Sequence, residues 1–215
     1  MTDIDSSDQP LPDGSEIRRR PQQSRSRQKV EAILDATAAL IGEKGVDSVT
    51  MRDIARTINA PLSVIYQYFP NKSAIVETLY ARFTEQIRAE TVQTVTDIRT
   101  PAEFLDALDN LLEHYYISMR AHPLAADVVS AILADNKLRH LDIEDSRQQA
   151  DVMSAAGLKF VSVDKRDEFE RLMFLFNHLV GGLMRLLLDS DDGNARVILD
   201  DYKRIARQQL QSFFG

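Results

Sequence analysis

The chain has 215 residues, of which 44% are hydrophobic, and a formal net charge of −7. This length and apolar content suffice for a substantial core, whereas the lack of cysteine excludes a disulfide framework, a thiol nucleophile and a thiolate metal site. No run of about 18 apolar residues predicts a transmembrane helix, and the acidic, polar N-terminus is unlike a signal peptide, so we expect a soluble cytoplasmic protein.

The charge is unevenly distributed along the chain. Residues 1–16 hold five acids and no base, residues 17–72 hold ten Lys or Arg against five acids, and residues 73–215 hold sixteen against twenty-three. Partner choice follows the local charge rather than the total. We therefore predict a disordered arm over residues 1–23, acidic and then basic, whose basic part is either a nucleic-acid contact or a solvated tail.

The first predicted helix covers residues 27–43, where apolar residues recur at spacings of three and four. Gly45 lies just past its end, as is typical of a helix stop. Thr50 and Asp53 then have the spacing of a capping box, in which each side chain bonds the backbone of the other residue. A short helix is expected to follow them.

Two short helices joined by a tight turn are predicted next. Asn59 tolerates a left-handed turn, and proline at the first position favours a second short helix over residues 61–68. Ala55 is small where the two helices must cross, while Ile65 and Phe69 face the shared core. Together with the preceding helix, this pattern predicts a helix-turn-helix.

The outward face of the second short helix is the candidate nucleic-acid contact. Tyr66 offers a hydroxyl on a rigid arm to a phosphate. Lys72 adds a positive charge near the start of the next helix, where free backbone amides already favour anions. The other residues on or near this face are Leu62, Ser63, Val64, Gln67 and Tyr68.

Residues 27–75, above all TMRDIARTINAPLSVIYQYFPNKSAI, resemble the DNA-binding domain of the tetracycline-repressor (TetR) family of bacterial transcriptional regulators. The residues that carry the resemblance are Thr50, Ile54, Ala55, Asn59, Tyr66, Gln67, Tyr68, Phe69 and Lys72. Asn59 replaces the usual turn glycine, and residues 61–64 are unusually apolar. The resemblance implies a DNA-binding domain over residues 24–72, with candidate contacts at Arg25, Arg27, Thr50, Met51, Arg52, Pro61, Leu62, Ser63, Val64, Tyr66, Gln67, Tyr68 and Lys72.

The rest of the chain is predicted to be helical throughout. Asn71 caps a long helix that runs to about residue 93, and Thr100 with Pro101 starts another that runs to about residue 120. Further helices are expected over residues 123–134, 136–156, 164–188 and 194–213. No segment alternates as a strand does, so the expected fold is all-α with about nine helices.

The resemblance implies that residues 73–215 form an effector-binding and dimerisation domain. The helix over residues 164–188 is apolar on more than one face, as in a helix buried on two sides. Gly181 and Gly182 in its middle suggest the close approach of another helix, either across a dimer interface or within the chain. The predicted interface comprises Phe169, Val180, Gly181, Gly182, Met184, Ile198, Tyr202 and Ile205.

A ligand pocket between these helices is a further candidate, although ordinary core packing accounts for the same residues. Its predicted lining is Phe104, Leu108, Leu111, His114, Tyr115, Met119, Val129, Leu133, Met153, Met173, Phe176 and Asn177. Buried polar groups require partners, which makes the polar members the more informative ones. The four histidines share no metal-ligand spacing, so we expect neither a metal site nor a cofactor.

These observations together predict a ligand-responsive regulator. It is expected to bind a palindromic operator on double-stranded DNA as a homodimer, to act as a repressor, and to be released by a small apolar or aromatic effector. No phosphate loop, nucleophile elbow or HExxH motif supports an enzyme. A helical adaptor that binds protein through residues 61–68, without effector control, is the alternative.

Overall fold

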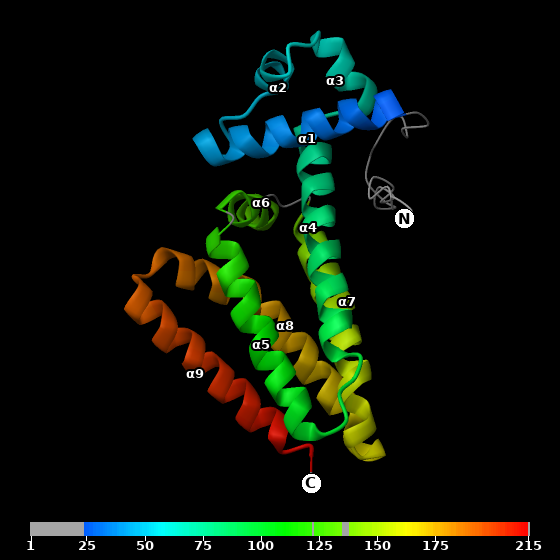
Figure 1. Cartoon of the computed structure of the whole chain (residues 1–215), viewed down its shortest axis with the longest axis vertical. Coiled ribbons are helices and arrows are strands. Elements are labelled where there is room, and N and C mark those ends of the chain that lie inside the picture. Colours follow the sequence, from blue (N-terminus) through cyan, green and yellow to red (C-terminus); the bar gives the residue numbers. More distant parts are fainter. Residues whose placement is uncertain (1–23, 122, 135–137, 215) are drawn as a thin grey trace, which may run out of the picture. The chain divides into compact units, whose positions relative to one another are not determined.

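The computed structural model describes residues 24–121, 123–134 and 138–214, all arranged in helices and connecting turns (Figure 1). The predicted arm over residues 1–23 lies outside this described part. Within it, the α-helices are α1 (Ser24–Lys44), α2 (Met51–Thr57), α3 (Leu62–Tyr68), α4 (Lys72–Val95), α5 (Pro101–Ala121), α6 (Pro123–Ala134), α7 (Arg139–Gly157), α8 (Arg166–Asp189) and α9 (Asp192–Gln211). Two short 3-10 turns, Leu158–Phe160 and Val163–Lys165, join α7 to α8. The all-α prediction with nine α-helices is confirmed.

Internal contacts divide the chain into two compact units, one ending at Phe83 and the other starting at Thr84. The division falls inside α4, whereas the sequence suggested a boundary at residue 72. The first unit includes the start of α4 because Ala74, Ile75 and Val76 are buried. Each unit therefore takes part of this 24-residue helix.

The first unit contains α1, α2, α3 and the first part of α4. In α1, Val30, Ile33 and Leu34 are buried at the three- and four-residue spacing that the sequence showed. Ile54 of α2 and Ile65 of α3 are also fully buried, and α2 packs against both α1 and α3. The short helices α2 and α3 are therefore stabilised by packing, since seven residues are too few for an independent helix.

Local signals determine where these helices begin and end. The Thr50 hydroxyl accepts a bond from the Asp53 amide, and the Asp53 carboxylate accepts one from the Thr50 amide, which completes the predicted capping box. Asn59 has a φ of 49° and Gly45 a φ of 76°, so both turns use the left-handed region. The Asn71 side chain accepts a bond of 2.8 Å from the Ala74 amide at the start of α4.

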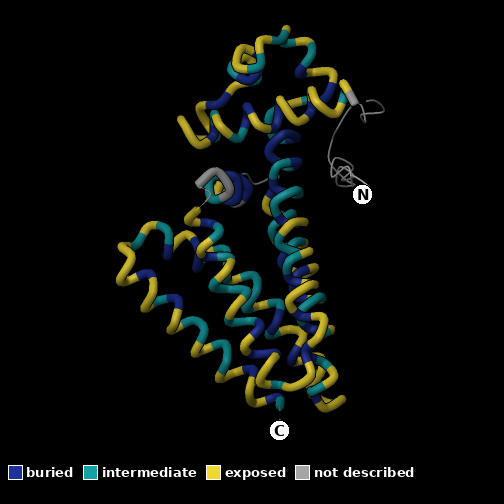
Figure 2. The backbone as a smooth tube through the Cα atoms, in the orientation of Figure 1, coloured by how far each residue is buried: buried dark blue, intermediate teal, exposed yellow. Residues whose placement is uncertain are grey.

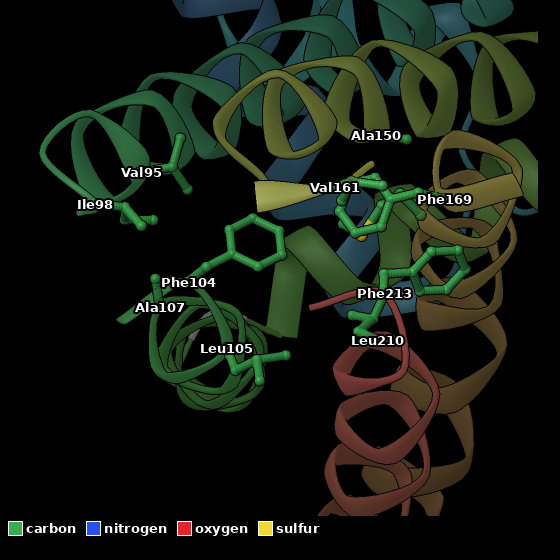
Figure 3. Packing of buried hydrophobic residues seen from close by; sticks show 11 residues of the cluster. Val95, Ile98, Phe104, Leu105, Ala107, Ala150, Val161, Phe169, Leu210 and Phe213 are labelled. Carbon is green, nitrogen blue, oxygen red and sulfur yellow. The ribbon is translucent and has the colours of Figure 1, made fainter. Parts of the chain in front are cut away.

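The second unit packs α5, α7, α8 and α9 together, with α6 against α5, α7 and α8. Its buried apolar side chains form two clusters. The first apolar cluster, shown in Figure 3, consists of Val95, Ile98, Phe104, Leu105, Ala107, Ala150, Val161, Phe169, Met173, Leu210 and Phe213. The second apolar cluster consists of Tyr116, Leu183, Met184, Leu187, Ala195 and Leu199.

Ion pairs hold α9 to α5 along the edge of these clusters. Arg207 bonds Asp106 and Asp109 at 2.6 and 2.5 Å, and the Glu113 carboxylate pairs with both Arg196 and Lys203. These two cations keep the pKa of Glu113 below its usual value, with the hydrogen bond from Lys203 as the larger cause. The packing of α9 on α5 therefore depends on charge as well as on apolar burial.

Candidate nucleic-acid interface and effector site

The outward face of α3 carries most of the predicted DNA contacts. Pro61, Ser63, Tyr66 and Gln67 are exposed, and Leu62 and Val64 are half-buried. Phe69, at the C-terminal cap of α3, is fully buried, as the sequence predicted. A helix with this division has one face in the core and the other free for a groove.

Tyr68 is a correction to the predicted contact set. Its side chain is buried in the first unit, three residues after the buried Ile65 and therefore on the same face of α3. The seven-residue helix has too few positions for its apolar pattern alone to assign Tyr66 and Tyr68 to opposite faces. Of the two tyrosines, only Tyr66 is exposed, at 41%.

Lys72 has partners within its own unit. Its ammonium group donates a hydrogen bond of 2.6 Å to the Val46 carbonyl and a longer one of 3.4 Å to that of Asp47. It thus ties the start of α4 to the loop between α1 and α2. Because an ammonium group has three N–H donors, one donor remains for a phosphate, but Lys72 also holds the fold together.

The remaining predicted contacts lie on α1 and α2. Arg25 and Arg27 are exposed at the start of α1, and Arg52 is exposed on α2 beside the half-buried Met51. Thr50 is exposed, and its hydroxyl is engaged in the cap of α2. The arginines accordingly present positive charge to solvent near the helix-turn-helix.

The acid of the capping box is surrounded by donors. Asp53 accepts hydrogen bonds from Lys44 and Thr50 and pairs with Arg56. The bond from Lys44 is the main cause of a pKa far below the usual range for this carboxyl. Asp53 therefore stays ionised, and its charge is neutralised locally rather than directed toward an approaching phosphate.

Much of the predicted pocket lining belongs to the core instead. Phe104 and Met173 are members of the first apolar cluster, where the Phe104 ring lies 6.0 Å from that of Phe169. Met119 and Val129 are also buried. The other apolar members pack against the first cluster, namely Leu108, Leu111, Met153 and Phe176. The side chain of Leu133 lies outside the described part of the structure.

The polar members of the predicted pocket have separate positions. His114 is exposed, and its ring lies 3.5 Å from the Glu90 carboxylate. Asn177 donates a hydrogen bond of 2.9 Å to the Ser146 carbonyl on α7. Burial raises the pKa of Tyr115, and the nearby carboxylates of Asp145 and Asp142 raise it further.

Sequence reasoning missed a polar group on α7 next to these residues. Asp142, Asp145, Ser146 and Gln149 are half-buried or buried, although a helical segment so rich in polar residues is expected to face solvent. The spacings of three, four and seven along α7, which place these residues on one face, were the available signal.

A serine, a histidine and an aspartate meet in this group, but not as a nucleophilic triad. The Ser146 hydroxyl lies 3.0 Å from Nδ1 of His178, and the Asp142 carboxylate lies 3.6 Å from the same nitrogen. A triad requires the two partners to be on opposite ring nitrogens. Among the described residues, no group of three or more His, Cys, Asp and Glu side chains is placed to hold a metal ion.

Part of the predicted dimer interface is buried in the chain's own core. Phe169 belongs to the first apolar cluster and Met184 to the second. A Cβ on Gly181 would point toward Asp142 of α7, at 4.0 Å, whereas one on Gly182 would meet open space. Val180, Ile198 and Tyr202 are half-buried against the second cluster, and Ile205 is exposed.

An exposed apolar stripe runs along α8 instead. Leu175, Leu179 and Leu186 are 49%, 48% and 53% exposed, and Gly182 completes their spacing of four, three and four. On α9, Val197 and Ile205 are also exposed, and Figure 2 shows buried and exposed segments alternating along that helix. We name Leu175, Leu179, Gly182, Leu186, Val197 and Ile205 the α8–α9 stripe.

One described segment, Val163–Asp189, is long and apolar enough to cross a membrane by length and composition alone. The sequence had predicted no such helix. The core helix of a soluble protein passes the same test, and α8 contributes Asn177 and His178 to polar contacts with α7. Its apolar character is accounted for by two core clusters on one side and the stripe on the other.

Comparison with known families agrees with this architecture. The family model described as "Bacterial regulatory proteins, tetR family" matches residues 33–83, and the one described as "Tetracyclin repressor-like, C-terminal domain" matches residues 102–214, more than half of the chain. The chain belongs to the TetR family. The resemblance found at residues 27–75 is thereby confirmed and extends over the C-terminal helices.

Curated relatives of this TetR-family chain are transcriptional regulators. The HTH-type transcriptional regulator BetI of Rhizobium meliloti (strain 1021) is 30% identical over 104 residues, which are 48% of each chain. The HTH-type transcriptional repressor KstR of Mycolicibacterium smegmatis is 28% identical over 48% of this chain and 50% of that protein. The chain thus spans about half the length of these two relatives. Both matched families are described as regulators. The comparisons therefore support a regulator over an enzyme or a protein-binding adaptor.

Solved structures share the fold over most of this TetR-family chain. A TetR-family transcriptional regulator from Streptomyces coelicolor superposes with a TM-score of 0.62 at 23% identity, over 88% of this chain and 99% of that one. SmeT, the repressor of a Stenotrophomonas maltophilia multidrug efflux pump, gives a TM-score of 0.60 at 19% identity, over 85% and 88%. At these identities the likeness concerns the fold.

Proposed function

We propose that the protein is a ligand-responsive, DNA-binding transcriptional regulator, most simply a repressor that occupies a promoter. The observation that carries this proposal is the exposed face of α3, with Ser63, Tyr66 and Gln67 directed to solvent in a helix-turn-helix of a TetR-family chain. Exposed arginines at the start of α1 and on α2 supply positive charge nearby. A groove-binding helix beside cationic side chains suits duplex DNA.

The contacts divide into two kinds. Tyr66 and the arginines are assigned to phosphates, which position the protein on any sequence. Leu62, Ser63, Val64 and Gln67 are assigned to base edges, where an apolar side chain favours the thymine methyl group and glutamine pairs with adenine. Sequence preference should therefore reside in the first turns of α3 and at Gln67.

Binding to duplex DNA at increasing salt is the test of this function. A protein that neutralises several phosphates releases counterions, so its affinity should fall steeply and linearly on a logarithmic salt scale. Binding to operator fragments selected from genomic DNA should exceed binding to random duplex. A protein that binds neither duplex at low salt would remove the proposal.

Tyr66→Phe is expected to weaken binding to all duplexes by about the same factor, roughly threefold to tenfold, because it removes one hydrogen bond to the backbone. Gln67→Ala is the matched variant on the same exposed face and should change the order of preferred sequences. Fluorescence anisotropy with a set of duplexes measures both. A change of preference in the tyrosine variant would assign Tyr66 to a base instead.

Lys72→Ala should also weaken binding to all duplexes, and it should destabilise the first unit as well. The reason is that the Lys72 ammonium bonds the Val46 carbonyl at 2.6 Å, and removing it leaves that acceptor without this donor. Thermal unfolding of the variant separates the two effects. An unchanged melting temperature together with weaker binding would assign Lys72 to DNA alone.

Deletion of residues 1–23 is expected to leave the fold intact, reduce DNA affinity and flatten the salt slope, because Arg18, Arg19 and Arg20 are assigned to phosphates or a minor groove. Deletion of the acidic residues 1–16 alone serves as the control and should not weaken binding. An unchanged slope in the longer deletion would mean that the arm makes no contact.

The proposed active form is a homodimer that pairs through the α8–α9 stripe and reads a palindromic operator. Two-fold symmetry of the protein then matches two half-sites on the duplex. A small molecule with an apolar or aromatic body is the proposed effector, bound in the second unit. An effector that loosens DNA binding tenfold has a coupling free energy of about 1.4 kcal/mol, and DNA must weaken effector binding by the same factor. The proposed site of action of such an operator-binding protein is the cytoplasm.

A further inference from the structure

The polar group on α7 contains two buried acceptors that lack hydrogen-bond partners. Among the described residues, Oδ1 of Asp145 and Oε1 of Gln149 are buried and accept no hydrogen bond. Gln149 is only 4% exposed. A buried acceptor left unpaired is unfavourable because it has lost its hydrogen bonds to water. The two residues are four positions apart, so they share one face of α7.

The surroundings of these two atoms are rich in acceptors. Burial raises the pKa of the Tyr115 phenol on α5, and the carboxylates of Asp145 and Asp142 raise it further. The Ser146 hydroxyl is already engaged with His178, and its carbonyl with Asn177. A ligand group with only acceptors would therefore satisfy neither Oδ1 of Asp145 nor Oε1 of Gln149, because both atoms require a donor.

The guanidinium of Arg88 does not satisfy Oδ1 of Asp145, although Thr84 donates a hydrogen bond to the same carboxylate. Nη1 of Arg88, on α4, is 3.8 Å from Oδ1 of Asp145, beyond hydrogen-bond distance. The same guanidinium bonds the Gln148 side chain at 2.5 Å and pairs with Glu85. Arg88 is thus held toward the outer side of α7, and the inner carboxylate oxygen remains without a donor.

Apolar side chains flank this polar group on both sides. Ala150, next to Gln149, belongs to the first apolar cluster, and Tyr115 packs against the second. On α8, Asn177 stands between Met173 of the first cluster and Leu183 of the second. A ligand that reaches the two unpaired oxygens from within the second unit would therefore have apolar side chains around its remaining atoms.

We propose that the effector carries a primary or secondary ammonium group, whose N–H donors bind Oδ1 of Asp145 and Oε1 of Gln149. This inference rests on the proposed function and assigns a chemical class to its effector, an amine with an apolar or aromatic body. A charged donor supplies both the hydrogen bonds that the two oxygens lack and the counter-charge that Asp145 lacks at hydrogen-bond distance.

The test uses three amines, butylamine, hexylamine and 2-phenylethylamine, each paired with the alcohol of the same skeleton. Calorimetry on the full chain at neutral pH should show that at least one amine binds more tightly than its alcohol. Asp145→Asn should weaken that amine about tenfold or more, as expected for a lost charged hydrogen bond. Asp151→Asn, an exposed residue on the same helix, is the matched control and should leave binding unchanged.

Gln149→Met is a second variant, of similar volume, that removes the amide oxygen. It should also lower the affinity for the amine. Three results would overturn the inference. They are equal binding of every amine and its alcohol, equal effects of the Asp145 and Asp151 variants, and a crystal structure in which an ordered water bonds both oxygens while no amine binds.

The same preparations also separate this inference from the proposed function. Tight operator binding without amine selectivity would remove the amine assignment and leave the DNA-binding regulator in place. Selective amine binding by a protein that does not bind duplex DNA would remove the proposed DNA-binding function and leave the amine site in place. When both are present, the amine should reduce operator affinity in the wild type and not in Asp145→Asn.

Discussion

Leu179→Asp is expected to convert the dimer to a monomer and to abolish tight operator binding. Leu179 is the middle leucine of the α8–α9 stripe and is 48% exposed in the single chain. Full burial of a leucine contributes about 1.5–3 kcal/mol, and an isologous interface contains each residue twice. A carboxylate at this position removes that gain. In the dimer it would also bury two like charges, one from each protomer, and their desolvation opposes pairing.

The measurement is sedimentation of the purified protein over a range of concentrations, followed by operator binding. Ile117→Asp, at a position 48% exposed on α5, is the matched control because it places the same charge on an equally exposed apolar site. It should remain a dimer. If both variants dissociate, or if neither does, pairing through the α8–α9 stripe is contradicted.

Loss of DNA binding should follow from loss of the dimer rather than from damage to α3. A monomer reaches one half-site at a time, so it loses the gain from simultaneous engagement, which amounts to a factor of roughly 100 or more. The Leu179→Asp monomer should therefore retain weak, salt-dependent binding to any duplex. Complete loss of that residual binding would indicate that the first unit had been affected.

The parts of the fold that the sequence predicted well depend on local chemistry. The Thr50–Asp53 capping box, the left-handed Asn59 and the Asn71 cap each involve residues within three positions of each other. Such interactions form wherever the helix ends, whatever packs on it later. The helix boundaries in the first unit follow from them.

The site residues were predicted less well because burial is decided by partners distant in sequence. Apolar periodicity marks the face of α8 that leaves solvent, but it does not distinguish the chain's own core from a second copy. Phe169 and Met184 turn to the core, while Leu175 and Leu179 remain exposed. The same limit applies to the predicted pocket lining. Phe104 and Met173 pack with other apolar side chains in one cluster, and periodicity does not distinguish such a core from a pocket.

The burial of polar residues on α7 was not predicted from the sequence. Asp145 and Gln149 belong to a helix segment whose many charges predict a solvated face, yet both lie toward the interior of the second unit. No local rule identifies a polar residue that tertiary packing buries, because its burial is unfavourable in isolation. A ligand contact is one role that would offset this unfavourable burial.

Asp145 also makes a distinct prediction about stability and pH. Burial is the main cause that raises its pKa from 3.8 to about 6, and the carboxylates of Asp142 and Glu85 add to it, whereas Thr84 and Arg88 act in the opposite direction. The folded state therefore holds this proton more tightly than the unfolded state. Stability contributed by the protonated form is present at low pH and is lost as the pH rises from about 4 to about 6.

Asp145→Asn should accordingly stabilise the second unit at neutral pH, by on the order of 2–3 kcal/mol, since each pKa unit corresponds to about 1.4 kcal/mol. The gain should shrink toward zero near pH 4, where the wild-type carboxyl is protonated and resembles the amide. Urea unfolding of both proteins at pH 4 and pH 7.5 measures this, because carboxylates common to both cancel in the difference. Asp151→Asn, on the exposed side of α7, should change stability little at either pH. A stability difference between Asp145→Asn and the wild type that is the same at both pH values would show that the Asp145 carboxyl does not titrate in this window. A stabilised variant that has also lost amine binding would indicate that the wild-type chain keeps a destabilising charge at this position for its ligand.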